Sequence, residues 1–295
     1  MTFLRWVGSK RKIVHKFKDM FPDINKCIGY IEPFLGGGSV FYYLRQNYDM
    51  EGKPIYLSDI NKELITAYRI VRDRLDELIP LLEIHQNLNN REYFDNMRKI
   101  FPPGDGMTDV QKAACFIYLS KCVFGSKWVV NSNGKLSTTY RGNEGEDIFD
   151  RSILKSCSML LQGTKINSHP FERILQFKDL ENYFIYFDPP YYDVGVKDYA
   201  KDKFSRDTKE KIRSVFEELD KRGAKLMMSN SDGPTVRSYF KNYNIIVIDT
   251  GRVADTFYTK YTKSERENID TGINEVIITN YEPMKKQKTI DDAWF

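Results

Sequence analysis

The sequence has few cysteines and histidines, and their placement argues against two kinds of site. The four cysteines are Cys27, Cys115, Cys122 and Cys157; they form no CxxC pair, none lies beside a histidine, and the three histidines are scattered. Protein zinc sites need clustered Cys and His ligands, and a cysteine nucleophile needs an activating neighbour. We therefore expect no metal site and no cysteine nucleophile. The thiols are expected to be reduced core residues of an intracellular protein, cytoplasmic if the host is a bacterium.

Long apolar runs and a strong net charge are also missing. No segment approaches the roughly 18 apolar residues of a membrane span. Arg5, Lys10 and Arg11 interrupt the N-terminus where a secretory signal would be apolar. The net charge of +4 is small, so a nucleic-acid surface would have to be a local patch. At 295 residues the chain can form one large domain or a domain with an insertion, and we expect no membrane partner.

A strand, a glycine-rich turn and a helix form the first informative unit. A strand over 27–34 leads into the run Glu32-Pro33-Phe34-Leu35-Gly36-Gly37-Gly38, and a helix is expected over 39–47. This order is typical of the nucleotide-binding unit of α/β folds. The turn is not GxGxxG, it lacks the GK[ST] of a phosphate loop, and Glu32 would repel a pyrophosphate. A ligand with an amine or hydroxyls suits Glu32 better, such as the methionine part of S-adenosylmethionine.

A second strand, over 54–57, ends at Ser58-Asp59-Ile60-Asn61. Asp59 lies roughly 20 residues past the glycine turn, where a carboxylate can accept the two ribose hydroxyls of an adenosine. The alternative is that Asp59 caps the next helix, and both roles can hold.

The strongest local signal is the stretch Tyr186-Phe187-Asp188-Pro189-Pro190-Tyr191-Tyr192, which follows a strand over 183–187. Proline fixes φ and offers a carbonyl without a competing N–H, and α/β sheets bind their ligands at the carboxyl ends of strands. A planar group with an amine could be held by Asp188, the Pro189 carbonyl and the flat face of Tyr191. By itself, the stretch also fits a strand followed by a polyproline turn.

Helical spacing over 61–86, 91–101 and 109–124 interrupts the alternation of strands and helices and indicates an inserted subdomain. Two strand-like runs around Asn133-Gly134 predict a β-hairpin. Its polar tip, near Lys127 and Arg141, could enter a DNA groove, or the hairpin could simply be solvated.

The remaining elements complete an α/β pattern. Phe171, after a short strand, could face an adenine ring or belong to the core. Thr208 is the expected N-cap of a helix over 208–222, and the segment 193–207 is expected to be a mobile loop over the site. The other expected elements are a helix over 153–162 and strands over 165–168, 225–228, 244–249 and 275–281.

Five motifs occur in an order that resembles the Dam-type (α-class) DNA adenine-N6 methyltransferases: FLRWVGSK, EPFLGGGSV, LSDIN, YFDPPYY and NEVIITNYEP. The resemblance covers most of 1–70 and 165–283. It implies a Rossmann-like S-adenosylmethionine-dependent methyltransferase sheet with an inserted helical target-recognition subdomain that carries the β-hairpin. The catalytic domain would comprise 1–61 and 150–283, the target-recognition subdomain 62–149, and a flexible tail 284–295.

The resemblance also implies roles for particular residues. Asp188 and the Pro189 carbonyl would accept hydrogen bonds from N6 of an adenine flipped out of duplex DNA, and Tyr191 would stack on its ring. The residues implied to contact S-adenosylmethionine are Trp6, Lys10, Glu32, Phe34, Gly36, Asp59, Phe171 and Asp188. The candidate DNA contacts are Arg5, Arg11, Lys127, Asn133, Arg141 and Lys260.

Other functions compete with this prediction. Cytosine-N4 methyltransferases usually carry Ser before Pro-Pro-Tyr, so Asp188 favours adenine. A catalytically idle methyltransferase-like DNA-binding module would not need Asp188, Tyr191 and Asp59 together. Where GATC-specific Dam enzymes carry an aromatic–Asn pair, this chain has Phe124-Gly125. The target sequence therefore stays open. The sequence also leaves open whether a cognate restriction endonuclease is a partner and what the oligomeric state is.

Overall fold

The computed structural model describes residues 1–104, 106–126, 128–131, 133–192, 206–248 and 274–283. Lys127, Lys260 and the segments 193–205 and 284–295 lie outside the described residues, and so do the predictions made for them.

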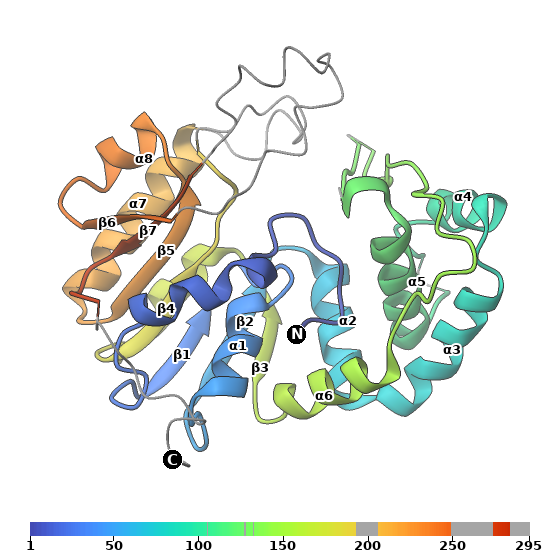
Figure 1. Cartoon of the computed structure of the whole chain (residues 1–295), viewed down its shortest axis with the longest axis horizontal. Coiled ribbons are helices and arrows are strands. Elements are labelled where there is room, and N and C mark those ends of the chain that lie inside the picture. Colours follow the sequence, from blue (N-terminus) through green and yellow to red (C-terminus); the bar gives the residue numbers. More distant parts are fainter. Residues whose placement is uncertain (105, 127, 132, 193–205, 249–273, 284–295) are drawn as a thin grey trace.

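Seven strands form one sheet in the order β3-β2-β1-β4-β5-β7-β6 (Figure 1). The strands are β1 (Gly29–Glu32), β2 (Ile55–Asp59), β3 (Lys165–Ser168), β4 (Tyr183–Phe187), β5 (Lys225–Ser231), β6 (Asn244–Ile248) and β7 (Glu275–Thr279). The first five in this order are parallel, and β7 runs antiparallel to both of its neighbours. The strand order turns back between β1 and β4, and α/β sheets bind their ligands at such a point.

The strands are buried on both faces because alternate residues enter two different cores. Tyr30, Phe184 and Tyr186 lie in the core shared with α1 (Ser39–Asn47) and the N-terminal segment. Ile185 and Phe187 lie in a second core, which they share with α7 (Arg206–Lys221), α8 (Pro234–Tyr239) and the 3₁₀ helix η4 (Phe171–Gln176). Burial on both faces is the expected condition of parallel strands.

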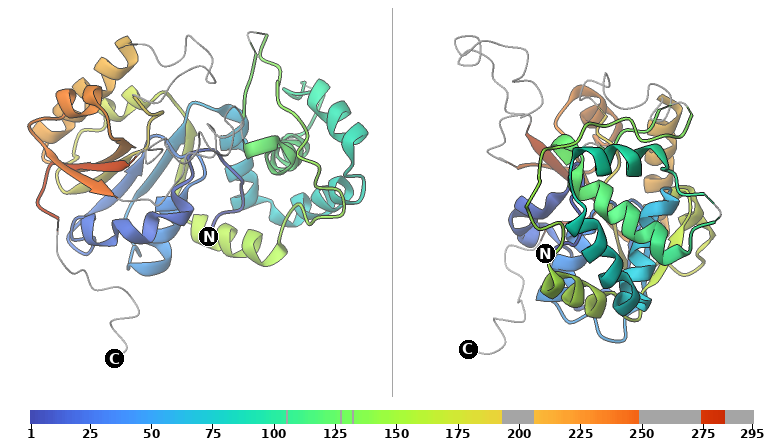
Figure 2. Two further views of the ribbon diagram at one scale, coloured as in Figure 1. Left: turned by 45° about the horizontal axis from the view of Figure 1, so that its top comes forward. Right: turned by 90° about the vertical axis from the view of Figure 1, so that its right-hand side faces the viewer.

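A group of helices lies beside the sheet, next to strands β2 and β3 (Figure 2). It comprises α2 (Lys62–Asp73), α3 (Leu75–Asn87), α4 (Arg91–Lys99), α5 (Asp109–Cys122) and α6 (Arg151–Leu161). Helix α5 is the centre of the group: ten of its residues are buried, and α2, α3 and α4 pack on it. Helix α2 also packs on β2 and β3, so it joins the helical group to the sheet.

Several expected elements differ in detail. The helical pattern over 61–86 is two helices, because the backbone leaves the helical region at Arg74 (φ −139°, ψ 38°). This break lets α2 pack on the sheet while both α2 and α3 pack on α5. Helix α7 begins at Arg206, so Thr208 lies in its first turn and is not the N-cap. Two 3₁₀ helices, η1 (Lys10–Lys12) and η2 (Val14–Met20), follow Ser9 in the N-terminal segment.

The segment around Asn133-Gly134 pairs antiparallel but irregularly. Single bridges join Val130 to Leu136 and Val123 to Tyr140, and the Ser137 N–H donates to the Val129 carbonyl at 2.7 Å. Among the described residues it is therefore a loop held by isolated bridges rather than a regular two-stranded ribbon.

Candidate active site

Four polar groups meet where the strands end at the centre of the sheet. Glu32 is the last residue of β1, Asp59 is the last of β2, Asp188 directly follows β4, and Ser229 lies near the end of β5. These strands are parallel neighbours, so their carboxyl ends lie side by side and bring the four side chains together.

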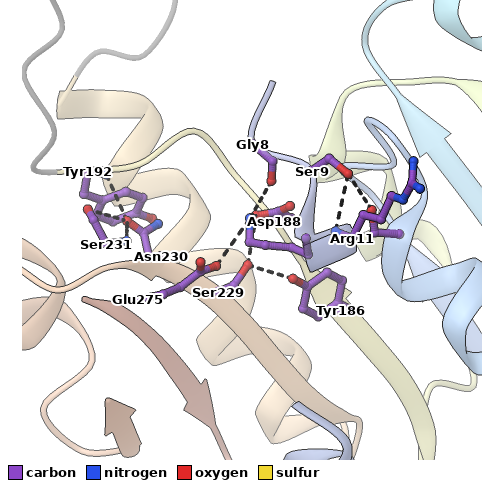
Figure 3. Close-up of polar contacts among 12 residues, drawn as sticks. Gly8, Ser9, Arg11, Tyr186, Asp188, Tyr192, Ser229, Asn230, Ser231 and Glu275 are labelled. Carbon is purple, nitrogen blue, oxygen red and sulfur yellow. Dashed lines mark hydrogen bonds and ion pairs between the residues drawn. The ribbon is translucent and has the colours of Figure 1, made fainter. Parts of the chain in front are cut away.

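Asp188 is held by hydrogen bonds at one of its two carboxylate oxygens. Its Oδ1 accepts from the Lys10 ammonium and from Ser229 Oγ, the latter at 2.8 Å. Since Ser229 donates its only proton to Asp188, the 2.7 Å contact between Ser229 and Tyr186 must be a donation by the Tyr186 hydroxyl. Figure 3 shows Asp188, Ser229 and Tyr186 in this arrangement. The Asp188 side chain is 21% exposed, and its Oδ2 has no partner among the residues that the structure describes.

The chain after Asp188 is fixed by β5. The Tyr192 N–H donates to Asn230 Oδ1 at 3.0 Å (Figure 3). Asn230 lies within β5 and is fully buried, so the turn that carries Pro189, Pro190 and Tyr191 is tied to the sheet at both ends.

Lys10 is buried between two carboxylates, although the sequence suggested a cofactor contact for it. Besides Asp188, its ammonium lies 3.4 Å from Glu275 Oε1, donates to the Gly8 carbonyl at 3.1 Å, and sits 5.1 Å from the centre of the Tyr191 ring. Burial alone would lower the pKa of Lys10, but the charge of Asp188, followed by Tyr191 and Glu275, raises that pKa well above its ordinary value. The ammonium therefore stays charged at neutral pH.

The glycine turn is pressed between two aromatic side chains. Gly36 and Gly38 have φ of +46° and +65°, a backbone region that side chains other than glycine rarely adopt. A Cβ on Gly36 would lie 3.1 Å from the Trp6 ring, and one on Gly38 would lie 2.7 Å from the Tyr68 hydroxyl. Trp6 in turn stacks on Trp128 at 6.0 Å between ring centres, so it links the turn to the helical group.

Asp59 is tied to the glycine turn. Its Oδ2 accepts from the Gly36 N–H at 3.0 Å and its Oδ1 accepts from the Asn61 N–H at 2.9 Å. Burial raises the pKa of Asp59, and these backbone donors oppose that rise. Asn61, not Asp59, is the N-cap of α2, because its side chain accepts from the Leu64 N–H at 2.9 Å. The capping role considered for Asp59 is therefore wrong.

Glu32 is a buried carboxyl without an ion pair among the described residues. It is 2% exposed, and the Tyr30 hydroxyl donates to it at 2.7 Å. Burial raises the pKa of Glu32 to about 8; the Tyr30 hydrogen bond opposes the rise and the charge of Asp188 adds to it. A cation brought beside Glu32 would favour its ionised form.

Phe34 and Phe171 come together beside these carboxylates. Their ring centres are 5.2 Å apart with an interplanar angle of 27°, and Phe34 also packs 6.1 Å from Phe187. Both phenylalanines are only partly buried, so the pair presents a flat apolar surface next to the strand ends.

Three of the candidate DNA contacts, Arg5, Arg11 and Arg141, lie close enough to Lys121 for their charges to act on it. Arg5, Arg11 and Asn133 are exposed, while Arg141 is half-buried and ion-paired with Glu146. Lys121, at the end of α5, was not predicted as part of this group. Burial lowers the pKa of Lys121, and the positive charges of Arg11, Arg5 and Arg141 lower it further, so each of the three arginines lies within electrostatic reach of Lys121.

Sequence reasoning missed Ser229, Glu275 and Lys121. The run Ser229-Asn230-Ser231-Asp232 was expected to follow a strand, and its position at the same edge as Asp188 was the available signal. For Glu275 the signal was an acid followed directly by three apolar residues at the start of an expected strand, Glu275–Thr279, all of which is buried.

Within the described residues, no group of three or more His, Cys, Asp or Glu side chains could hold a metal ion. No helix in that same part of the chain is long and apolar enough to cross a membrane. The four cysteines are buried and unbonded, and burial raises their pKa values to about 11 or 12, so their thiols are poor nucleophiles at neutral pH.

A sheet that turns back beside a glycine turn, with an aspartate and prolines at the next strand end, defines a Rossmann-like methyltransferase. Residues 6–253 match the family model of the D12 class N6 adenine-specific DNA methyltransferases. The chain belongs to this family and is an adenine-specific DNA methyltransferase.

Curated relatives match over nearly the whole chain. A type II methyltransferase of Methanocaldococcus jannaschii, M.MjaIII, is 32% identical, covering 95% of this chain and 98% of its own length. The type II methyltransferase M1.LlaDCHI of Lactococcus lactis subsp. cremoris is 30% identical, covering 95% of each chain. The DNA adenine methylase of Escherichia coli K12 is 24% identical, covering 85% of this chain and 88% of its own length. Membership of this family favours the adenine-N6 methyltransferase over the two alternatives left open by the sequence, the cytosine-N4 enzyme and the idle DNA-binding module.

Proposed function

We propose that the protein transfers a methyl group from S-adenosylmethionine to N6 of an adenine flipped out of duplex DNA, at a specific sequence. The observation that carries this proposal is how the two carboxylate oxygens of Asp188 are hydrogen-bonded. Its Oδ1 is held by Lys10 and Ser229, while its partly exposed side chain leaves Oδ2 available to an entering amine. The glycine turn, Asp59 and Glu32 lie at the neighbouring strand ends.

The residues present fit S-adenosylmethionine. The glycine turn has no Cβ atoms where Trp6 and Tyr68 close over it. Asp59 accepts from the backbone N–H groups of Gly36, Asn61 and Ile60, and a carboxylate with about four acceptor sites keeps capacity for a ribose hydroxyl. Glu32 would pair with the donor's ammonium group, and the Phe34–Phe171 surface suits a flat adenine ring. When bound, this cofactor supplies an electrophilic methyl group.

The chain's own residues would position the nucleophile. The lone pair of the adenine amine is delocalised into the ring, so hydrogen bonds from the amine to Asp188 Oδ2 and to the Pro189 carbonyl would favour its localisation on nitrogen. Flipping a base out of the duplex costs a few kcal/mol, and stacking on an aromatic ring returns about 1–3 kcal/mol. Tyr191 can therefore offset much of that cost.

The test is methyl transfer to DNA followed by nucleoside analysis. Labelled S-adenosylmethionine and unmethylated duplex DNA should give N6-methyladenine. Label in N4-methylcytosine, or no transfer to any of a set of random-sequence duplexes, would contradict the proposal. Asp188→Ala should abolish transfer to adenine. Asp179→Ala changes an exposed aspartate that precedes β4 and should leave transfer unchanged.

The type II names of two relatives support a role in restriction–modification, and we infer a cognate restriction endonuclease as a further partner. Mapping the methylated adenine by sequencing would define the target. DNA methylated by the protein should then resist an endonuclease that cuts the same sequence, and cleavage at the unmodified rate would contradict this role.

A further inference from the structure

Lys10 occupies one oxygen of the Asp188 carboxylate, whose other oxygen is proposed to accept from the target amine. The only partners described for Asp188 are Lys10 and Ser229, and both act on Oδ1. A strong ion pair at Oδ1 draws charge away from Oδ2 and weakens it as a hydrogen-bond acceptor. An arriving amine therefore finds Asp188 partly neutralised unless the Lys10 ammonium can retreat.

Glu275 lies where the ammonium would go. Its Oε1 is 3.4 Å from Lys10 Nζ, and both side chains are almost fully buried, at 3% and 2% exposure. Charge-assisted hydrogen bonds of this kind are about 2.7–2.9 Å long, so a shift of roughly half an ångström would close the contact. During that shift the ammonium can keep its bond to the Gly8 carbonyl.

We propose that Glu275 is a positioning residue for methyl transfer: it holds the Lys10 ammonium when the target amine takes over Asp188. The inference rests on the proposed role of Asp188 as the acceptor of the amine. It adds that Asp188 accepts mainly from Lys10 before the DNA binds and mainly from the adenine amine afterwards.

The physical reason is the cost of an unpaired buried charge. If Glu275 were absent, moving the Lys10 ammonium away from Asp188 would leave a buried charge uncompensated, which is strongly unfavourable. With Glu275 present, Lys10 has a carboxylate partner at every stage. Ser229 meanwhile continues to hold Asp188 Oδ1, which keeps Oδ2 aimed at the base.

The sheet holds Glu275 in place for this role. Glu275 is the first residue of β7 and is paired on one side with Ser231 of β5 and on the other with Ile248 of β6. Its backbone is therefore fixed by two neighbouring strands, so the mobile partner in the exchange is the long Lys10 side chain. Figure 3 shows the Glu275 carboxylate pointing toward the group around Asp188.

The first test is Glu275→Gln, which keeps the shape of the side chain and removes its charge. We expect kcat to fall at least tenfold, with the affinities for S-adenosylmethionine and DNA changed less than threefold. Base flipping, read from the fluorescence of 2-aminopurine at the target position, should change less than kcat, because this analogue lacks the 6-amino group and reports only the effect of Glu275 on Tyr191. Glu282→Gln alters an exposed glutamate just after β7 and should behave as the parent protein.

The second test separates positioning from a structural role. In Lys10→Met/Glu275→Gln no ammonium competes for Asp188, so the double variant should transfer methyl at least fivefold faster than Glu275→Gln. If Glu275 only stabilised the fold, the double variant would be no faster. A parental kcat for Glu275→Gln, or a double variant no faster than the single one, would overturn the inference.

A third comparison covers the case in which Glu275→Gln does not fold. Lys10→Met and Lys10→Met/Glu275→Gln should then have equal rates or the double variant should be faster, because Glu275 has no ammonium left to hold. A tenfold slower double variant would overturn the inference. Failure of the proposed function itself would be recognised separately, since the parent protein would then place no methyl group on adenine.

Discussion

Glu32 makes the stability of the folded protein depend on pH through one buried carboxyl. In the folded protein its pKa is about 8, against an ordinary value of 4.5. The unfolded chain therefore ionises Glu32 at a pH where the folded chain does not. The folded protein consequently loses stability at this site as the pH rises from about 4.5 through 8, by up to about 1.4 kcal/mol per pH unit.

Glu32→Gln removes this titration and keeps an oxygen that can accept from Tyr30. We expect the variant and the parent to have similar free energies of unfolding near pH 5 and the variant to be more stable near pH 8. Urea unfolding at both pH values measures the difference. A stability gain that is the same at both pH values would contradict the raised pKa. The variant should also bind S-adenosylmethionine at least tenfold more weakly, because the proposed partner of its ammonium is lost.

Gly38 combines a left-handed backbone with a close neighbour. Gly38→Ala should lower the free energy of unfolding by about 1–2 kcal/mol for the backbone alone. The new Cβ would also lie 2.7 Å from the Tyr68 hydroxyl, which adds to the loss.

Gly52→Ala is the matched control for this change. Gly52 has a similar φ of +69° and open space around it, so its replacement isolates the backbone cost. Chemical denaturation should show a clearly larger loss for Gly38→Ala, together with weaker cofactor binding. Equal losses would mean that Tyr68 moves aside without cost.

At the scale of elements, one side chain joins α5 to the loop after the hairpin segment. Asn89 lies between α3 and α4, and its Oδ1 accepts from the hydroxyls of Tyr118 and Tyr140, both at 3.2 Å. Its Nδ2 donates to the Asn143 carbonyl at 2.9 Å. The position of the hairpin segment relative to α5 thus depends on a buried polar network.

Asn89→Leu leaves two buried hydroxyls and one carbonyl without this partner and should cost about 2–4 kcal/mol of stability. Tyr118→Phe and Tyr140→Phe each remove one donor and should cost about 1 kcal/mol or less. Thermal or urea unfolding measures all three. An Asn89→Leu loss no larger than that of a single tyrosine variant would show that the network is not cooperative.

The break between α2 and α3 shows why the sequence predicts some elements and misses their ends. The apolar spacing runs through Arg74 with no glycine or proline at the break, and the one proline of the run, Pro80, lies inside α3, so local pattern alone predicts one helix. The turn is decided by packing, because α2 must contact β2 and β3 while both helices contact α5. Strands β1, β2 and β4 lie within a few residues of their expected positions, since their burial and their flanking turns are both local features.

At the scale of the whole molecule, the basic group of Arg5, Arg11, Lys121 and Arg141 lies at the junction of the sheet and the helical group. The net charge is only +4, so this local cluster is the main candidate for contact with DNA phosphates. It supports our proposal that 1–61 and 150–283 form the catalytic domain, 62–149 the target-recognition subdomain, and that DNA lies across both.

Lys121→Met should weaken binding to all duplex sequences alike and reduce the slope of log affinity against log salt by about 1. The measurement is a titration of DNA binding over a range of salt concentrations. Lys178→Met, at an exposed lysine before the amino end of β4, should leave the slope unchanged. A change in sequence preference with an unchanged slope would mean that Lys121 contacts a base instead.

The sequence by itself determined the motifs, their order and the class of chemistry. Gly36, Asp59 and Asp188 are recognisable because each follows a strand within a short local pattern. The tertiary structure alone decided how the site is held. Lys10 and Asp188 are 178 residues apart, and the carboxylate of Glu275 reaches Lys10 from a strand near the end of the described chain. Such contacts depend on strand order and burial, which bring distant residues together without leaving a local pattern in the sequence.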